Sequence, residues 1–161
     1  TLPLPEALLE DVPQFLMHLI GQVRDLTPLY WDKKRFGEPP TEDETIGHFL
    51  LPLLGSLGWP PELVAIKWHD IDVCLFHRLP RTPDNSALVI EAKRLGEGIE
   101  GAFGQAKGYL DKLSVVRDIV VTDGIRYRFY AANQEFEPTA YANLAYLKEP
   151  SLLLFNKLRR K

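Results

Sequence analysis

The feature that most constrains this chain is a short apolar segment that ends in charged residues, at positions 87–94 (ALVIEAKR). Residues 88–90 form an apolar run whose length fits a buried strand. Side chains two positions apart in a strand project from the same face, so Glu91 and Lys93 point the same way. A carboxylate and an ammonium are costly to bury unless they are paired or serve a site. The end of this strand is therefore a candidate functional position.

A second strand is expected just upstream, at residues 71–76 (IDVCLF), where side chains alternate between the two faces. The segment RLPRTPDNS between the two strands is rich in Pro, Asn and Ser and is typical of a loop. Strands joined in this way pair most simply as an antiparallel hairpin, which brings Asp72 near Glu91. Asp70 is an alternative candidate for the metal-binding acid, but Asp72 fits the alternation of the strand and is the better candidate.

Two helices are expected before this hairpin. Residues 5–26 carry apolar side chains at helical spacing, and Pro13 favours a start of the main helix near Val12. Thr41 and Glu44 then form the capping-box pattern of a second helix, which Gly58 ends. The proline at position 52 should kink that second helix. The capping role explains Glu44 without any metal.

Residues 27–41 are expected to form a loop in which Lys33, Lys34 and Arg35 lie beside aromatic residues. Such a cluster can grip a nucleic-acid backbone. It can equally be a solvated loop with aromatic anchors, and one short cluster favours this second interpretation.

The hairpin is followed by a helix, a pair of strands and a last helix. Gly96 and Gly98 lead into a helix over residues 99–113, in which Gln105 and Tyr109 lie four apart and share one face. Residues 119–121 and the alternating segment 127–131 are expected strands, with Asp123-Gly124 as the hairpin turn between them. Residues 132–150 show no clear pattern, and a C-terminal helix is expected at about 150–161.

Composition limits the class of protein. A chain of 161 residues with 45% hydrophobic and 25% charged side chains fits a single globular domain with a real core. No apolar run reaches the roughly 20 residues of a membrane span, and the single cysteine, Cys74, suggests a reducing compartment, so we expect a cytoplasmic protein. The net charge of −3 argues against a passive DNA-binding protein. It argues less against a nuclease, because metal-binding carboxylates add negative charge.

The residue types at the hairpin fit metal-dependent hydrolysis of a phosphodiester. Such a reaction uses a divalent cation to hold the phosphate and to lower the pKa of water. Magnesium prefers oxygen ligands, and Asp72, Glu91 and the backbone carbonyl of Ala92 would supply them. Lys93 would orient the attacking water or stabilise the transition state. Gln105 and Tyr109 are placed to touch the phosphate or the lysine.

A purely structural interpretation exists for each part. Glu91 and Lys93 alone could be an ordinary charge pair at a strand end, with Asp72 a turn residue. The complete set is more specific. It needs an Asp at the head of one strand, Glu-x-Lys at the end of the next, and Gln-x-x-x-Tyr on the following helix.

This ordered set, with the acid of Glu44 before it and Val121-Thr122-Asp123-Gly124 after it, resembles the PD-(D/E)XK nuclease superfamily. Within that superfamily the chain is most similar to the N-terminal nuclease domain of type I restriction enzyme motor subunits, from about position 44 to 130. Ile71 stands where the motif has its proline. The resemblance implies an α/β restriction-endonuclease-like core, a central mixed sheet flanked by helices.

By the same resemblance Asp72, Glu91 and Glu44 would lie at a Mg²⁺ or Mn²⁺ ion, and Lys93 would be the catalytic lysine. Gln105 and Tyr109 match the helix motif of the family. Within residues 1–161 we expect one domain with an N-terminal helix at 5–26, a core at about 41–131 and the C-terminal helix.

Two hypotheses follow. The first is an Mg²⁺-dependent DNA endonuclease, acting with a helicase or translocase motor, with a specificity subunit, or as a dimer. The second is a catalytically inactive module that keeps the fold for DNA binding or partner assembly.

Overall fold

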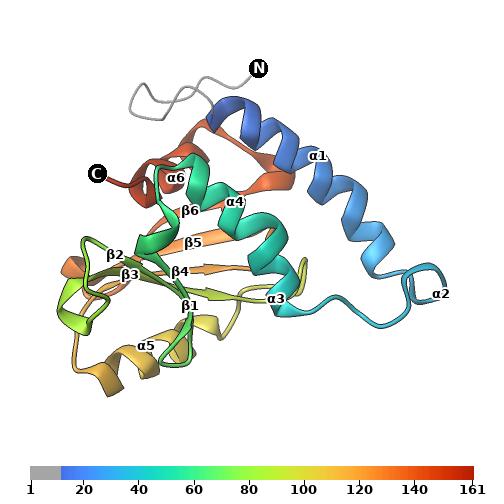
Figure 1. Ribbon diagram of the computed structural model, residues 1–161. Helices are drawn as coiled ribbons and strands as arrows, with labels where there is room; N and C mark the ends of the chain where they lie inside the picture. Colours follow the sequence, from blue (N-terminus) through green and yellow to red (C-terminus); the bar gives the residue numbers. More distant parts are fainter. Residues whose placement is uncertain (1–11) are drawn as a thin grey trace.

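The computed structural model describes residues 12–161 and shows an α/β protein with a six-stranded mixed sheet flanked by helices (Figure 1). Helix α5 covers one face of the sheet, and α1, α3, α4 and α6 lie on the other side (Figure 1). This confirms the expected fold class. The strands are β1 (Val64–Trp68), β2 (Ile71–Phe76), β3 (Ser86–Ala92), β4 (Asp118–Thr122), β5 (Arg126–Ala131) and β6 (Glu137–Asn143). The α-helices are α1 (Val12–Tyr30), α2 (Lys33–Phe36), α3 (Glu42–Thr45), α4 (Leu51–Ser56), α5 (Ala102–Leu113) and α6 (Leu152–Leu158). Short 3₁₀ turns lie at Pro61–Leu63, Pro83–Asn85, Ala132–Gln134, Leu144–Tyr146 and Glu149–Ser151.

The strands follow one another across the sheet in chain order, β1 to β6. All neighbours are antiparallel except β3 and β4, which run parallel. The expected β2–β3 and β4–β5 hairpins are therefore confirmed. Every residue of β2 is buried, which fits a strand that is covered on both faces.

The parallel pair sets the position of the candidate site. A parallel connection needs a crossover, and α5 supplies it between β3 and β4. Ala92 pairs with Thr122, so the carboxyl ends of β3 and β4 lie side by side. In open α/β sheets, ligands bind outside the carboxyl ends of the strands.

Helix α1 is longer than expected. It is helical from Val12, the first described residue, to Tyr30, and α2 follows. The loop predicted at 27–41 is therefore wrong at residues 27–30 and 33–36, and the part of the 5–26 helix before Val12 lies outside the described residues. Asp32 explains α2, because its carboxylate accepts hydrogen bonds from the backbone N–H groups of Lys34 and Arg35. Sequence periodicity gives no signal for so short a helix.

The helix over residues 42–56 contains a wide turn before its proline. The segment Ile46–Leu50 is a π-helix, and the Leu51 N–H donates to the Ile46 carbonyl five residues back. A proline inside a helix removes one N–H donor and clashes with a carbonyl in the preceding turn. The wide turn gives room for Pro52, so the expected irregularity takes the form of a π-bulge.

The capping box at the start of α3 is confirmed. The Glu44 N–H donates to Thr41 Oγ1 over 3.2 Å, and the Thr41 N–H donates to Glu44 Oε1 over 3.1 Å. Both orphan donors of the helix start are thereby satisfied.

Replacing Thr41 by alanine removes the acceptor for the Glu44 N–H, so the free energy of unfolding should fall by about 1 kcal/mol. Urea unfolding followed by circular dichroism measures this change. Thr82→Ala is the matched control, because Thr82 precedes a 3₁₀ turn without a side-chain cap bond. An equal loss in both variants would mean that the cap contributes nothing.

The C-terminal part adds a strand that the sequence did not reveal. Strand β6 pairs with β5, so the sheet extends beyond the core predicted at 41–131. Most of its residues are exposed or half-buried, and this weak apolar alternation explains the omission. The last helix is confirmed but ends at Leu158. Among residues 12–161 no helix is long and apolar enough to cross a membrane.

Candidate active site

Two carboxylates lie on facing positions of neighbouring strands. Strands β2 and β3 pair Val73 with Ile90, and the next position in the same register sets Asp72 opposite Glu91. Their exposed fractions are only 4% and 2%. The Ala92 N–H donates to Asp72 Oδ2 over 2.8 Å, which fixes the Asp72 carboxylate against the end of β3. The sheet therefore brings together Asp72, Glu91 and Ala92, as predicted.

The surroundings of the Glu91 carboxyl group disfavour its charged form. Burial first, and then the neighbouring charge of Asp72, raise the pKa of Glu91 to about 8, against the opposing effect of Lys93. Glu91 Oε2 is buried and has no hydrogen-bond partner among residues 12–161. A buried acceptor without a partner next to a second carboxylate is costly unless a cation or a proton compensates it.

Lys93 is held by the helix that follows it. Its backbone N–H donates to the Thr122 carbonyl over 2.8 Å, which continues the β3–β4 pairing by one residue. Its Nζ donates to Gln105 Oε1 over 3.3 Å, and Gln105 Nε2 donates to the Tyr109 hydroxyl oxygen over 2.9 Å. The predicted grouping of Lys93, Gln105 and Tyr109 is thus present as one chain of hydrogen bonds.

Lys67 is a member of this cluster that sequence reasoning missed. It lies between the β1–β2 pairs Ile66–Val73 and Trp68–Ile71, so it faces Asp72 from the far side of β2. Its Nζ is 2.5 Å from Asp72 Oδ1 and 3.4 Å from Asp43 Oδ1. Burial lowers the pKa of Lys67, but its hydrogen bond to Asp72 and the charges of both acids outweigh burial, and the net effect is a raised pKa.

A sequence signal for Lys67 did exist. The hairpin that ends one strand at Trp68 and begins the next at Ile71 places residues 67 and 72 opposite each other. The residue also has φ of 55°, a left-handed conformation that sequence patterns do not show for a lysine. From the sequence, residues 63–68 are expected to form a strand, but nothing there marks its end, so the partner of Asp72 could not be identified.

The acids of α3 divide into two roles. The Glu44 carboxylate is bonded to its own capping residue, and with burial it raises the pKa of Tyr30. Two other acids of this helix act on the cluster: Asp43 pairs with Lys67, and the charge of Glu42 adds a smaller part to the raised pKa of Glu91. Glu44 as a metal ligand stays a prediction.

Asp123 is a buried acid with a structural role. Its Oδ2 accepts hydrogen bonds from the Gly98 N–H and from Arg126 Nη1, each over 2.7 Å. Its Oδ1 accepts the N–H groups of Ile125 and Arg126. These bonds tie the segment after β3 to the β4–β5 turn. Asp123 thereby fixes the path of the chain from Lys93 to α5.

The donor set fits a hard divalent cation. Magnesium is held in proteins by one or two carboxylates with water and substrate oxygens, and Asp72 and Glu91 supply this number. The unpartnered Glu91 oxygen is where such an ion would relieve a cost that the described residues leave uncompensated. No cluster of three or more His, Cys, Asp or Glu side chains with metal-binding geometry occurs in the described part of the chain. Asp72 also shares its charge with Lys67, so an ion would have to compete with that ammonium.

Comparisons with known proteins give one similarity. No family model matches this chain, and a search of curated proteins finds no match either. Among solved structures, the chain is similar to a fragment assigned as an HsdR subunit of a type I restriction enzyme from Vibrio vulnificus YJ016, with 20% sequence identity and a TM-score of 0.49. The match covers 74% of this chain and 25% of that one, so this chain spans about a quarter of its length. The similarity concerns the fold alone.

Proposed function

We propose that this chain is a metal-dependent phosphodiesterase that cuts DNA internally. One observation carries the proposal. Two buried carboxylates, Asp72 and Glu91, face each other at the carboxyl end of a parallel strand pair, with an unpartnered oxygen on Glu91. The Lys93 ammonium lies at the same strand end. The described residues compensate Asp72 but leave this Glu91 oxygen without a partner, which a bound cation would supply.

In the proposed reaction, different residues would bind the metal ion, stabilise charge and position the lysine. Asp72, Glu91 and the Ala92 carbonyl would hold Mg²⁺ or Mn²⁺. When bound, the ion would lower the pKa of a water molecule and offset the charge that builds on the phosphate. Lys93 brings a positive charge and three N–H donors to the phosphate oxygens or to the attacking water. Gln105 and Tyr109 restrict the motion of the Lys93 side chain, so that less order has to be created during the reaction.

Nicking of supercoiled plasmid tests the proposal. Conversion to the open circular form is expected with Mg²⁺ or Mn²⁺ and is expected to stop with EDTA. The same reaction with an RNA substrate distinguishes a deoxyribonuclease from a nuclease that acts on RNA. Absence of nicking with either ion would remove the support for catalysis.

A non-catalytic module is the second candidate, and the Lys67–Asp72 ion pair favours it. That pair compensates one of the two acids without a metal ion. Calorimetric titration with Mn²⁺ separates the candidates. Binding that is lost in both Asp72→Asn and Glu91→Gln supports the nuclease, and no binding in the parent supports the module.

Lys67 should set the affinity of the site for metal. Removing its ammonium in Lys67→Met frees Asp72 Oδ1 and removes a competing positive charge, so the Mn²⁺ dissociation constant should fall about tenfold. Calorimetry in low-salt buffer measures the constant. Lys33→Met, an exposed lysine on α2, is the control for the loss of one charge and should change the constant less than about twofold. An unchanged constant in Lys67→Met would show that this lysine does not compete with the metal.

The partners that this chain needs depend on how many phosphodiester bonds one site can hydrolyse. A single site of this kind hydrolyses one phosphodiester bond, so a double-strand break needs a second copy of the chain or a second binding event. We therefore propose action as a dimer on DNA, or with a translocase motor or specificity subunit that delivers the DNA. We place this activity in the cytoplasm. Sedimentation with and without a plasmid fragment measures whether two copies assemble.

A further inference from the structure

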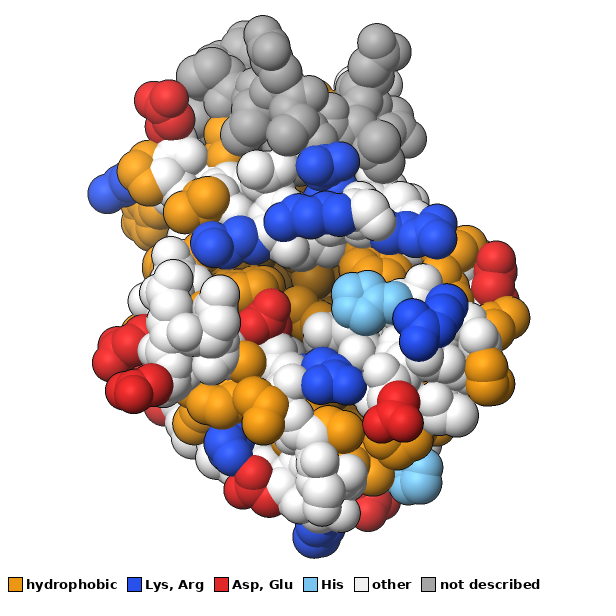
Figure 2. Space-filling view, turned by 90° about the vertical axis from the view of Figure 1, so that its left-hand side faces the viewer, with side chains coloured by type: hydrophobic (Ala, Val, Ile, Leu, Met, Phe, Trp, Pro, Cys, Tyr) orange, Lys and Arg blue, Asp and Glu red, His pale blue; other side chains and the backbone are white. Residues whose placement is uncertain are grey.

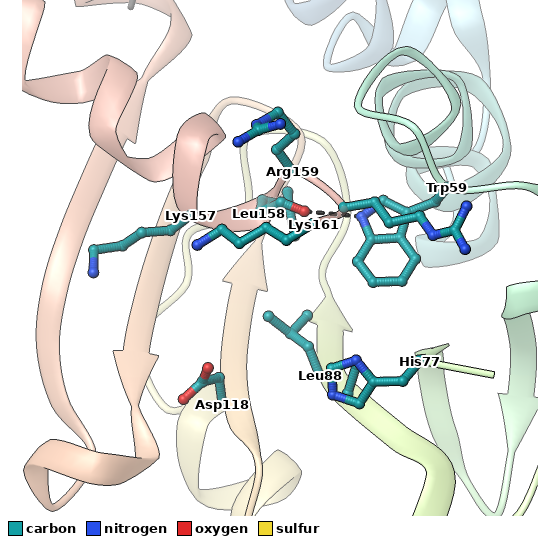
Figure 3. Close-up of a pocket in the computed structure, with 10 residues that line it drawn as sticks. Trp59, His77, Leu88, Asp118, Lys157, Leu158, Arg159 and Lys161 are labelled. Atoms are coloured by element: carbon teal, nitrogen blue, oxygen red, sulfur yellow. Dashed lines mark hydrogen bonds between the residues drawn. The ribbon is translucent and has the colours of Figure 1, made fainter. Parts of the chain in front are cut away.

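A hollow lies at the opposite end of strands β3 and β4 from the carboxylates. Leu88 near the start of β3 and Asp118 at the start of β4 lie on one side of it, beside His77 just after β2 (Figure 3). Residues 157–161, from the end of α6 onward, lie on the other side. The hollow has a volume of about 210 Å³. At about 3.3 Å per residue, Leu88 and Glu91 are about 10 Å apart along β3, so the two sites are distinct.

The segment beyond α6 is fixed by its backbone. Trp59 Nε1 donates to the Leu158 carbonyl over 2.8 Å (Figure 3), and the Arg160 N–H donates to the Leu57 carbonyl over 3.0 Å. Arg159 leaves the helix with φ −60° and ψ 140°, an extended conformation. The backbone therefore carries its side chains along the rim of the hollow in a defined order.

The rim is strongly positive. Four of the five residues at 157–161 are Lys or Arg, in a chain whose net charge is −3. None of these four forms an ion pair within residues 12–161, and Arg159 Nε is buried without an acceptor there. Lys and Arg side chains form a band across this face, above a hollow whose floor is hydrophobic (Figure 2). The one acid of the hollow, Asp118, accepts the Ala132 N–H through Oδ1.

Two other arginines of this region differ from the rim cations because their side chains are bonded to backbone carbonyls. Arg117 donates to Ser86 and to the carbonyls of Pro83 and Asp84, and so fixes the 3₁₀ turn before β3. Arg81 donates to three carbonyls of residues 61–64. The rim cations make no such bonds to the described residues. Lys157 Nζ lies 5.5 Å from the centre of the Phe129 ring, whereas Arg160 and Lys161 are exposed and their charge is available to a ligand.

We infer that this hollow binds single-stranded nucleic acid, with the rim cations on the phosphates and the ring of His77 against a base. Sites for single strands combine a positively charged groove with aromatic side chains on which bases stack. The hollow offers both, since the ring of His77 is exposed beside the rim cations, while the Trp59 indole is buried in its wall. A flexible single strand can turn a base toward such a hollow, whereas the bases of a duplex are stacked inside the helix. Binding in this hollow does not depend on the proposed cleavage at Asp72 and Glu91.

Fluorescence anisotropy of a labelled oligothymidylate of roughly 12 nucleotides, in EDTA, tests the inference. Arg160→Ala with Lys161→Ala should weaken binding at least about tenfold and should reduce the slope of log K against log salt by about 1.4, since each lost phosphate contact removes about 0.7. His77→Ala should weaken binding several-fold with the slope unchanged, and His77→Phe should restore it. The matched control, Lys33→Ala with Lys34→Ala, removes the same charge from α2 and should leave the affinity within about twofold of the parent.

Three results would overturn the inference. The first is parental affinity in the Arg160/Lys161 variant, and the second is an equal loss in the Lys33/Lys34 control. The third is binding of a duplex, or of polyglutamate, as tight as that of the single strand, which would show a general polyanion surface. Glu91→Gln is expected to bind the oligonucleotide like the parent. Failure of nicking and failure of this site are therefore read out separately.

Discussion

Replacing Glu91 by glutamine is expected to lower the rate of plasmid nicking by at least about 10³-fold, because it removes one of the two charged oxygen donors for the metal. Lys93→Met should have a similar effect, since it removes the ammonium that Gln105 orients but keeps the apolar stem of the side chain. The measurement is the initial rate of open-circle formation with saturating Mn²⁺. Saturation separates a loss of chemistry from a loss of metal affinity.

The two variants have matched controls. Glu62→Gln changes an exposed acid near the start of β1, and Lys34→Met changes an exposed lysine of α2, so both should cut within about twofold of the parent. Melting temperatures of all four variants show whether the fold is kept. If Glu91→Gln and Lys93→Met cut as fast as the parent, the catalytic site has been assigned to the wrong residues.

The second large effect concerns stability and pH. The pKa of Glu91 is about 8 in the folded protein, against 4.5 as its ordinary value. Between these two values the folded state holds a proton that the unfolded chain has released. Stability is therefore highest below the unfolded pKa and falls as pH rises through the folded pKa, by up to about 1.4 kcal/mol per pH unit. Glutamine at position 91 removes this titration.

Urea unfolding in EDTA between pH 5 and pH 8 measures the effect. The parent should lose about 2–4 kcal/mol relative to Glu91→Gln over this range. A parallel pH profile in the two proteins would show that Glu91 ionises normally. Adding Mn²⁺ should reduce the loss, because a cation that binds the ionised carboxylate favours the folded state at high pH.

The local elements were accessible from the sequence because they depend on neighbouring residues. Alternation and apolar runs predicted β2, β3 and β5, and the Asp123-Gly124 turn predicted the β4–β5 hairpin. The same locality explains the omissions. Helix α2 has only four residues, and most residues of β6 are exposed or half-buried, so neither produces a periodic pattern.

Part of the candidate site could also be predicted from the sequence. The alternation of β2 sets Asp72 in phase, and the two-residue spacing of Glu91 and Lys93 places both on one face. The loop between the strands predicted the pairing that brings Asp72 and Glu91 together. Gln105 and Tyr109 share a helix face by their spacing of four residues. Each of these conclusions needs only local geometry and one hairpin.

Only the tertiary structure decided how these charges are compensated. The ion pair of Lys67 with Asp72 depends on a left-handed residue in the β1–β2 hairpin. The bond from Lys93 to Gln105 depends on the crossover that lays α5 against β3 and β4. The raised pKa of Glu91 depends on burial, which is a property of the whole packed sheet. The sequence by itself determined which groups stand at the strand ends, and the three-dimensional packing determined which of them are paired, because a charge is sensed through space and not along the chain.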